Sequence, residues 1–265
     1  MASPPAHVTG RIAVVLRALA AFPDRGASTS RIARSAGLAR PTVHRLLAAL
    51  ADEGYVDRDH HTGSWYLGPE LYLLGEIAAQ RYDVTQHARA SVHRLAAATG
   101  ESAFFSARRG DETVCLLRED GDFPIRSFVL YEGARFPLGV VSAGLVVLSM
   151  LPDREIDDYL RRVDLTADWG PAHHAGEVRK RIALTRELGY AVNPGLVVEG
   201  SWGMAAAVFG RSGEPAWALT LTGVESRFRA DRRPELGALL LKEAHALTKV
   251  LQVREGDPRV ALPGS

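Results

Sequence analysis

"GLARPTVHRLLAALADEGYVDRDHHTGSWYLG", residues 37–68, holds a helix, a charged turn and a hairpin in one short run. Its apolar residues recur at i, i+3, i+4 and i+7, the spacing of an amphipathic helix. Pro41 suits the first turn of that helix, and Gly54 closes it. "YVDRD", "HHTG" and "SWYLG" then predict a strand, a turn and a second strand. The apolar stripe consists of Val43, Leu46, Leu47 and Leu50.

Two further helices precede this stretch. "RIAVVLRALAAF" (11–22) and "STSRIARSAGL" (28–38) both carry helical apolar spacing, and Gly37 ends the second. The order helix, helix, glycine turn, helix, hairpin is the plan of a winged helix-turn-helix. "PELYLLGEIAAQRYD" (69–83) predicts a connecting helix, so we place a domain boundary near residue 83.

The charge pattern indicates what this first domain binds. From Arg25 to Ala51 there are five arginines and no Asp or Glu. On a helix that turns about 100° per residue, Arg45 and Pro41 point away from the apolar stripe, and Thr42 and His44 flank it. These are positions that a recognition helix exposes to the major groove of DNA. A plain amphipathic helix with surface arginines is the alternative, and the surrounding order of elements argues against it. The predicted DNA-binding residues are Ser30, Arg40, Pro41, Thr42, His44, Arg45, His61, Thr62, Ser64 and Tyr66.

The remainder of the chain mixes strands and helices. Strands are predicted at 102–109, 113–119, 125–131, 203–210 and 215–223, and helices at 84–100, 140–151, 153–162, 177–189 and 234–252. This mixture predicts an α+β domain with a mainly antiparallel sheet.

Several classes of function are disfavoured by the composition. The one cysteine, Cys115, allows neither a disulfide framework nor a cysteine-based zinc cluster. The longest apolar run, residues 139–151, is too short to span a bilayer, and the N-terminus lacks the apolar core of a signal peptide. We therefore expect a cytoplasmic protein without membrane contact. No metal is predicted, because His173 and His174 have no third ligand at a suitable spacing, and no cofactor is predicted.

An enzyme is the least favoured alternative. "GVVSAG" around Ser142 is not a G-x-S-x-G motif, because Val140 occupies the first glycine position. A Rossmann or P-loop glycine signature is absent from the sequence. A DNA-binding architectural protein without a ligand is the other alternative. The length of chain after the DNA-binding part, which is enough for a full core, argues against it.

The sequence resembles the IclR family of bacterial transcriptional regulators. The N-terminal likeness lies in "RALAAF" (17–22), "RIARSAGLARPTVHRLLAALADEGYVDRD" (31–59) and "YLGPELYLLGEIA" (66–78). The C-terminal likeness lies in "GARFPLGVVSAGLVVLSMLP" (133–152), "RELGYAVN" (186–193), "EGSWGMAAAVF" (199–209) and "ALTLTGV" (218–224). Where the family usually has a histidine and a lysine near its pocket, this chain has Gly139 and Leu145.

The resemblance implies a domain plan and a function. A winged helix-turn-helix domain at 1–67 and a linker helix at 68–83 would precede a GAF-like effector-binding domain at 84–252. We expect the tail at 253–265 to be disordered. The implied protein is a transcriptional regulator, with a repressor favoured, that binds double-stranded DNA at palindromic operators. Family members form dimers, often paired into tetramers. A palindrome needs two recognition helices, and Leu71, Leu74 and Ile77 are the expected dimer contact.

The strand at 215–223 points to the effector site. Trp217, Leu219 and Leu221 face one way, and Thr220 and Thr222 face the other together with Ala218. Ordinary exposed threonines are one interpretation. The resemblance favours a ligand, because this strand lines the pocket in the family, and a helix start at 139–142 would suit a carboxylate. We therefore expect a compact organic acid, aromatic or hydroxylated, held by hydroxyls and backbone amides. The predicted effector-binding residues are Phe136, Leu138, Gly139, Val141, Ser142, Ala143, Asn193, Ser201, Gly203, Thr220 and Thr222.

Overall fold

The computed structural model describes residues 7–81 and 84–253 of the 265-residue chain. The chain divides into two compact units, one up to residue 82 and the other from residue 83, and each is described by itself. The tail that the sequence predicts to be disordered lies outside the described residues, apart from residue 253.

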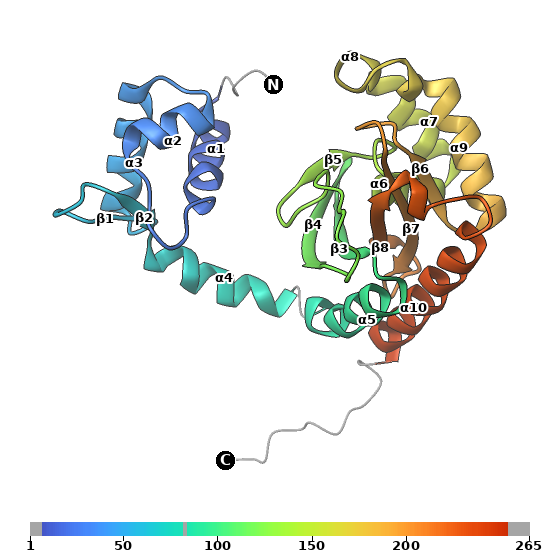
Figure 1. The fold of residues 1–265 in the computed structure, drawn as a ribbon. Coiled ribbons are helices and arrows are strands. Elements are labelled where there is room, and N and C mark those ends of the chain that lie inside the picture. The colour runs from blue at the N-terminus through green and yellow to red at the C-terminus, as the bar shows by residue number, and fades with distance from the viewer. Residues whose placement is uncertain (1–6, 82–83, 254–265) are drawn as a thin grey trace, which may run out of the picture. The chain divides into compact units, whose positions relative to one another are not determined.

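The first unit is a three-helix core with a small hairpin (Figure 1). It contains α1 (Val8–Ala20), α2 (Thr29–Ala36), α3 (Arg40–Asp52), β1 (Val56–Arg58), β2 (Trp65–Leu67) and α4 (Pro69–Arg81). Ser28 caps α2 by accepting a hydrogen bond from the backbone N–H of Arg31, and Gly37 ends it at a φ of +65°. The stripe of α3 packs on α1 and α2 through Val43 and Leu47, which are fully buried. The predicted winged helix-turn-helix is confirmed.

The second unit is a six-stranded antiparallel sheet with helices on both faces (Figure 1). The strand order is β5-β4-β3-β8-β7-β6. Its strands are β3 (Ser102–Arg109), β4 (Glu112–Glu119), β5 (Arg135–Pro137), β6 (Ala191–Pro194), β7 (Ser201–Phe209) and β8 (Pro215–Val224). Its helices are α5 (Val84–Thr99), α6 (Ser142–Ser149), α7 (Asp153–Arg162), α8 (Thr166–Trp169), α9 (Ala175–Leu188) and α10 (Arg233–Val253). The α+β class with an antiparallel sheet is confirmed.

Each face of this sheet has its own core. Leu219 and Leu221 of β8 belong to the core that α5 and α10 cover, as the alternation of the strand predicts. Ala218 belongs to the opposite core, where α6 packs on β7 and β8 and α9 packs on α6. Strand β8 lies between β3 and β7, so both of its edges are paired, and the helices on the two sides of the sheet cover both of its faces.

The strand predicted at 125–131 is wrong. This segment runs without regular structure, and the chain enters the sheet only at β5. Ile125, Phe128 and Tyr131 are exposed, whereas Leu130 is buried against the core under α6. The apolar residues that suggest a strand therefore belong to a covering loop. The short edge strand β6 was not predicted as a strand.

A buried carboxylate fixes the junction between α5, β3 and the loop before α10. Glu101 Oε1 accepts hydrogen bonds from Arg227 Nε and Arg232 Nη1, both at 2.6 Å. Both guanidinium groups also donate to the carbonyl oxygen of Thr99, at 3.1 and 2.7 Å. The side chain of Glu101 is 1% exposed, so the two arginines supply the counter-charge that it needs.

Glu101→Ala should lower the free energy of unfolding by about 3 kcal/mol, because two arginines lose the carboxylate that neutralises them. Urea denaturation followed by circular dichroism measures this loss. Asp231→Ala is the control, since Asp231 pairs with Arg229 at 3.5 Å on the surface and its removal should change stability little. Equal effects of the two substitutions would contradict the role given to Glu101.

Candidate functional site

The exposed side of α3 carries the cationic residues that the sequence predicts. Arg40, Pro41, His44 and Arg45 are exposed, and Thr42 is half-buried. Among the described residues, neither Arg40 nor Arg45 has a hydrogen-bond or ion-pair partner within the chain. Both guanidinium groups therefore remain available to an external anion or base.

Trp65 at the start of β2 holds the hairpin against the helices. Its indole Nε1–H donates to Thr29 Oγ1 at 3.0 Å, and its backbone exchanges two hydrogen bonds with Ala27. The ring of His44 meets the Trp65 ring edge-on at 6.4 Å, and the guanidinium of Arg58 lies 5.3 Å from its centroid. The hairpin is thus fixed beside α3, as a DNA-contacting wing requires.

The turn of the hairpin is closed by Asp59. Its Oδ1 accepts from the backbone N–H groups of His61 and Thr62 at 2.7 and 3.2 Å, and its Oδ2 accepts from the Thr62 hydroxyl at 2.9 Å. These hydrogen bonds, the one from His61 first, lower the pKa of the Asp59 carboxyl. The hydroxyl proton of Thr62 is therefore used inside the turn. The Tyr66 hydroxyl likewise donates within the chain, to the carbonyl oxygen of Arg25 at 3.1 Å.

In the second unit a cavity lies between the start of α6, β7 and β8, under the loop at 125–131. It encloses about 370 Å³ of empty space, its open mouth included. Eight of the residues that the sequence predicts for the effector site line it: Val141, Ser142, Ala143, Asn193, Ser201, Gly203, Thr220 and Thr222. Val129, Leu130, Val197 and Trp202 also line it and were not predicted. Three of these four belong to covering loops, where periodicity gives no signal.

The hydroxyl oxygens of Thr220 and Thr222 are buried. Both residues are buried, at 1% and 7% exposure, so the interpretation as exposed strand threonines is wrong. Among the described residues, neither Oγ1 atom has a hydrogen-bond partner. Thr222 lies opposite Gly203 on β7, and a Cβ at Gly203 would stand 3.0 Å from Ser142 Oγ and 3.7 Å from the methyl carbon of Thr222. The lack of a side chain at Gly203 thus leaves room beside Ser142 and Thr222.

Asn193 lines the cavity, and both ends of its side-chain amide have partners within the chain. Its Nδ2 donates to the carbonyl oxygen of Val140 at 2.7 Å, and its Oδ1 accepts from the backbone N–H of Leu196 at 3.0 Å. The side chain therefore ties the loop after β6 to the residue two positions before α6. At that helix start Val141 provides no side-chain cap, so backbone N–H groups of the first turn are left for another acceptor.

Phe136, Leu138 and Gly139 do not line the cavity. Phe136 packs against Trp169, with ring centroids 5.5 Å apart, and the Leu138 carbonyl accepts from the Tyr159 hydroxyl at 2.8 Å. Gly139 has a φ of +87°, and a Cβ there would stand 3.3 Å from Val178. The chain reverses at this glycine before α6 begins, so these residues face the core beneath α7 and α9. Of residues 136–143, only Val141, Ser142 and Ala143, which follow the turn, line the cavity.

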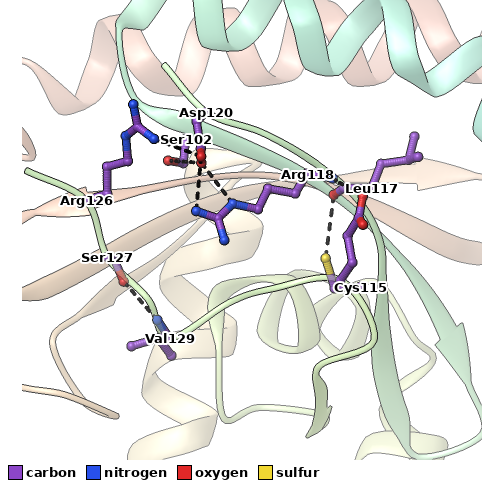
Figure 2. Close-up of polar contacts among 9 residues, drawn as sticks. Ser102, Cys115, Leu117, Arg118, Asp120, Arg126, Ser127 and Val129 are labelled. Atoms are coloured by element: carbon purple, nitrogen blue, oxygen red, sulfur yellow. Dashed lines mark hydrogen bonds and ion pairs between the residues drawn. The ribbon is translucent and has the colours of Figure 1, made fainter. Parts of the chain in front are cut away.

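The loop that covers the cavity is held by hydrogen bonds at two points. Asp120 accepts hydrogen bonds from Arg118, Ser102 and Arg126, which fixes the start of the loop (Figure 2). The bond from Arg118 contributes most to lowering the pKa of the Asp120 carboxyl. Further along, Ser127 Oγ lies 2.5 Å from Ser201 Oγ, the hydroxyl of a cavity residue. The cover is thus hydrogen-bonded to β7.

Within residues 7–81 and 84–253, no three His, Cys, Asp or Glu side chains gather as metal ligands would. His173 is buried between the carbonyl oxygens of Trp169 and Val140, at 2.8 and 3.3 Å. Across the same residues, no helix combines the length and hydropathy needed to cross a bilayer.

A winged helix-turn-helix joined in one chain to an α+β unit with a small cavity is the architecture of transcriptional regulators that respond to a small molecule. Residues 8–60 match the IclR helix-turn-helix domain, and residues 77–249 match the bacterial transcriptional regulator IclR C-terminal domain. The chain belongs to the IclR family, whose members are transcriptional regulators and not enzymes.

Known proteins resemble this chain over nearly its whole length. It is 25% identical to the acetate operon repressor of Salmonella typhimurium, over 92% of this chain and 91% of that protein. The Thermotoga maritima IclR crystal structure has a TM-score of 0.71 at 20% identity, with 92% and 98% of the two chains covered. An IclR homolog from Microbacterium hydrocarbonoxydans, complexed with 4-hydroxybenzoate, has a TM-score of 0.72 at 21% identity, with 91% and 98% covered. These two structures share its fold.

Replacing the two unpartnered threonines with valine should stabilise the ligand-free protein. Valine has nearly the same shape, so Thr220→Val with Thr222→Val removes two buried hydroxyls at little packing cost. We expect about 1 kcal/mol more unfolding free energy, measured in urea. In the control Thr99→Val, the hydroxyl donates to the Leu95 carbonyl at 2.7 Å, and its loss should cost about 1 kcal/mol. Destabilisation by both changes would show that the cavity hydroxyls have partners.

Proposed function

We propose that this protein is a cytoplasmic repressor that binds a palindromic operator and releases it when a small organic acid enters the cavity of the second unit. The observation that carries the proposal is the pair of buried, unpartnered hydroxyls of Thr220 and Thr222 beside a helix start with free amides. Buried polar groups without partners are costly, and a ligand that satisfies them removes that cost.

For DNA, the proposal assigns base contacts to α3. Arg40 and Arg45 are exposed and unpaired, and an arginine can bind guanine through two hydrogen bonds. Thr42 and His44 flank them, and Ser30 stands exposed on α2. His61 and Ser64 of the wing would contact phosphate. Thr62 and Tyr66, whose hydroxyls donate within the chain, would shape the wing instead.

The linker helix supports an assembly of two chains. Tyr72, Leu73, Leu74 and Ile77 of α4 are between 47% and 67% exposed, which is unusual for four large apolar side chains on one short helix. Leu71 is half-buried. A second copy that covers this surface would place two recognition helices on one palindrome. We therefore propose a homodimer through α4, with pairing of dimers as a further step.

For the effector, the cavity favours a compact acid with a ring. Among the residues that line it, none carries a charge, so a carboxylate would bind to the backbone amides at the start of α6. Val129, Leu130, Val141 and Val197 supply apolar walls for the ring, and the two threonines suit a hydroxyl. The 4-hydroxybenzoate complex of the Microbacterium homolog agrees with this chemistry.

Removing both arginines of α3 should weaken specific DNA binding. An operator would first be selected from random DNA by the wild-type protein, and its affinity for Arg40→Ala with Arg45→Ala would then be measured by fluorescence anisotropy. Each arginine that reads a base contributes about 1–3 kcal/mol, so the double variant should bind at least about tenfold more weakly. The control Arg154→Gln removes an exposed arginine of the second unit. Wild-type affinity in the double variant would refute the assignment. The stoichiometry should be two chains per palindrome.

Calorimetric titration tests the effector site. 4-Hydroxybenzoate, benzoate and pyruvate would be titrated into the wild type, into Thr220→Val with Thr222→Val, and into the control Thr99→Val. A hydroxylated aromatic acid should bind the wild type and the control alike and bind the cavity variant at least about tenfold more weakly, because two hydroxyl contacts are lost. If an acid that releases the operator binds all three proteins equally, the site lies elsewhere. If no acid changes operator affinity, the alternative of a ligand-independent DNA-binding protein holds.

A further inference from the structure

A second concave region lies at the edge of the sheet, away from the cavity. It runs along β6 between the C-terminal half of α9 and the start of α10. Strand β6 lies next to β7 at the end of the sheet (Figure 1). The concave region holds about 790 Å³ of empty space, open solvent included. We call it the β6 groove; its residues are Arg181, Leu184, Leu188, Tyr190, Val192, Pro194, Ala230, Arg233 and Pro234. None of these lines the cavity that holds Thr220 and Thr222.

Arg181 of α9 carries buried nitrogen atoms without partners. Among the described residues, neither its Nε nor its Nη2 atom has a hydrogen-bond acceptor. Burial lowers the pKa of this guanidinium, and the carboxylate of Glu177 opposes that effect only in part. The same Glu177 accepts a hydrogen bond from Lys180 at 2.7 Å. Unpaired buried donors on a cation are costly, so the site would gain from an anionic acceptor.

Arg233 at the start of α10 provides a second cation. Its guanidinium lies 5.4 Å from the ring centroid of Trp202, and among the described residues it has no carboxylate partner. None of the groove residues is acidic. The neighbouring Asp231 pairs with Arg229, at 3.5 Å. The groove therefore presents two positive charges without an ion-pair partner among the described residues, although the Glu177 carboxylate partly offsets that of Arg181.

The walls of the groove are apolar. Leu184 and Leu188 follow Arg181 along α9 and are 49% and 37% exposed. The Tyr190 ring lines the groove beside them. It packs closely on α10 at Gly237, where a Cβ would stand only 2.2 Å from the ring. A ligand with an apolar body would cover the leucines while its charged end reaches the arginines.

We propose that the β6 groove is a second ligand site, which binds a carboxylate that carries an apolar chain or ring. Charge complementarity selects the acid, and the exposed leucines select its body. The strand β6 would link this site to the cavity, because Val192 and Pro194 line the groove while Asn193 between them lines the cavity. This second site does not depend on the proposed DNA contacts of α3 or on the proposed effector in the cavity at Thr220 and Thr222.

Octanoate is a suitable probe, and its uncharged counterpart octan-1-ol isolates the contribution of charge. Both would be titrated calorimetrically into the wild-type full-length protein, into Arg181→Gln with Arg233→Gln, and into Arg154→Gln with Arg229→Gln. The last variant also loses two positive charges, but from exposed positions outside the groove. The cavity variant Thr220→Val with Thr222→Val forms a fourth arm, and circular dichroism confirms that each variant folds.

Octanoate should bind the wild type, the exposed-arginine control and the cavity variant with similar affinity, and bind the groove variant at least about tenfold more weakly. Octan-1-ol should bind the wild type about tenfold more weakly than octanoate. Absence of octanoate binding, equal binding of the alcohol, or loss of binding only in the cavity variant would each overturn the proposal. A change in oligomeric state of the groove variant, without octanoate binding to the wild type, would assign the groove to a contact between chains.

Discussion

A hydroxyl group that is buried without a hydrogen-bond partner is the constraint on which the second unit depends. Strand β8 lies between β3 and β7 and has both faces covered, so its alternating side chains must all be placed in an interior. Leucines satisfy this on the side of α5 and α10. On the other side Thr220 and Thr222 are buried equally deeply, and among the described residues their hydroxyls have no hydrogen-bond partner. Two apolar side chains at these positions would have avoided the cost of the unsatisfied hydroxyls.

The surroundings of these threonines keep that position open instead of filling it. Gly203 contributes no side chain opposite Thr222, Val141 leaves the first amides of α6 uncapped, and Asn193 holds the start of α6 in place through Val140. The loop rooted at Asp120 then closes the space from above. Each feature alone would be a small defect in packing. Together they keep open a cavity next to the threonine hydroxyls and the first amides of α6, and such a cavity suits a small molecule with hydrogen-bond acceptors.

The sequence predicts those parts of the structure in which buried positions recur at the period of the element. The stripe of α3 reflects one buried face, the alternation of β8 reflects two different cores, and both predictions hold. Residues 125–131 are mostly apolar without a strict alternation, and in the structure they cover a cavity and form no strand, so their composition misleads. Phe136 and Leu138 were expected in the cavity because the family resemblance places their segment at the pocket. A reversal of the chain at Gly139 separates them, and Val129 and Val197 reach the cavity from loops whose course no local pattern encodes.

Unpartnered polar groups have different meanings in the two units because burial differs. The guanidinium groups of Arg40 and Arg45 are exposed, so water satisfies them and their lack of partners costs the fold almost nothing. Stability measurements therefore cannot distinguish a DNA contact from a solvated surface arginine, and only binding can. The hydroxyls of Thr220 and Thr222 and the buried nitrogens of Arg181 lack that compensation. Their burial without a hydrogen-bond partner therefore already lowers the stability of the ligand-free fold. A ligand for either buried site would thus be detectable as added stability, independently of any effect on DNA.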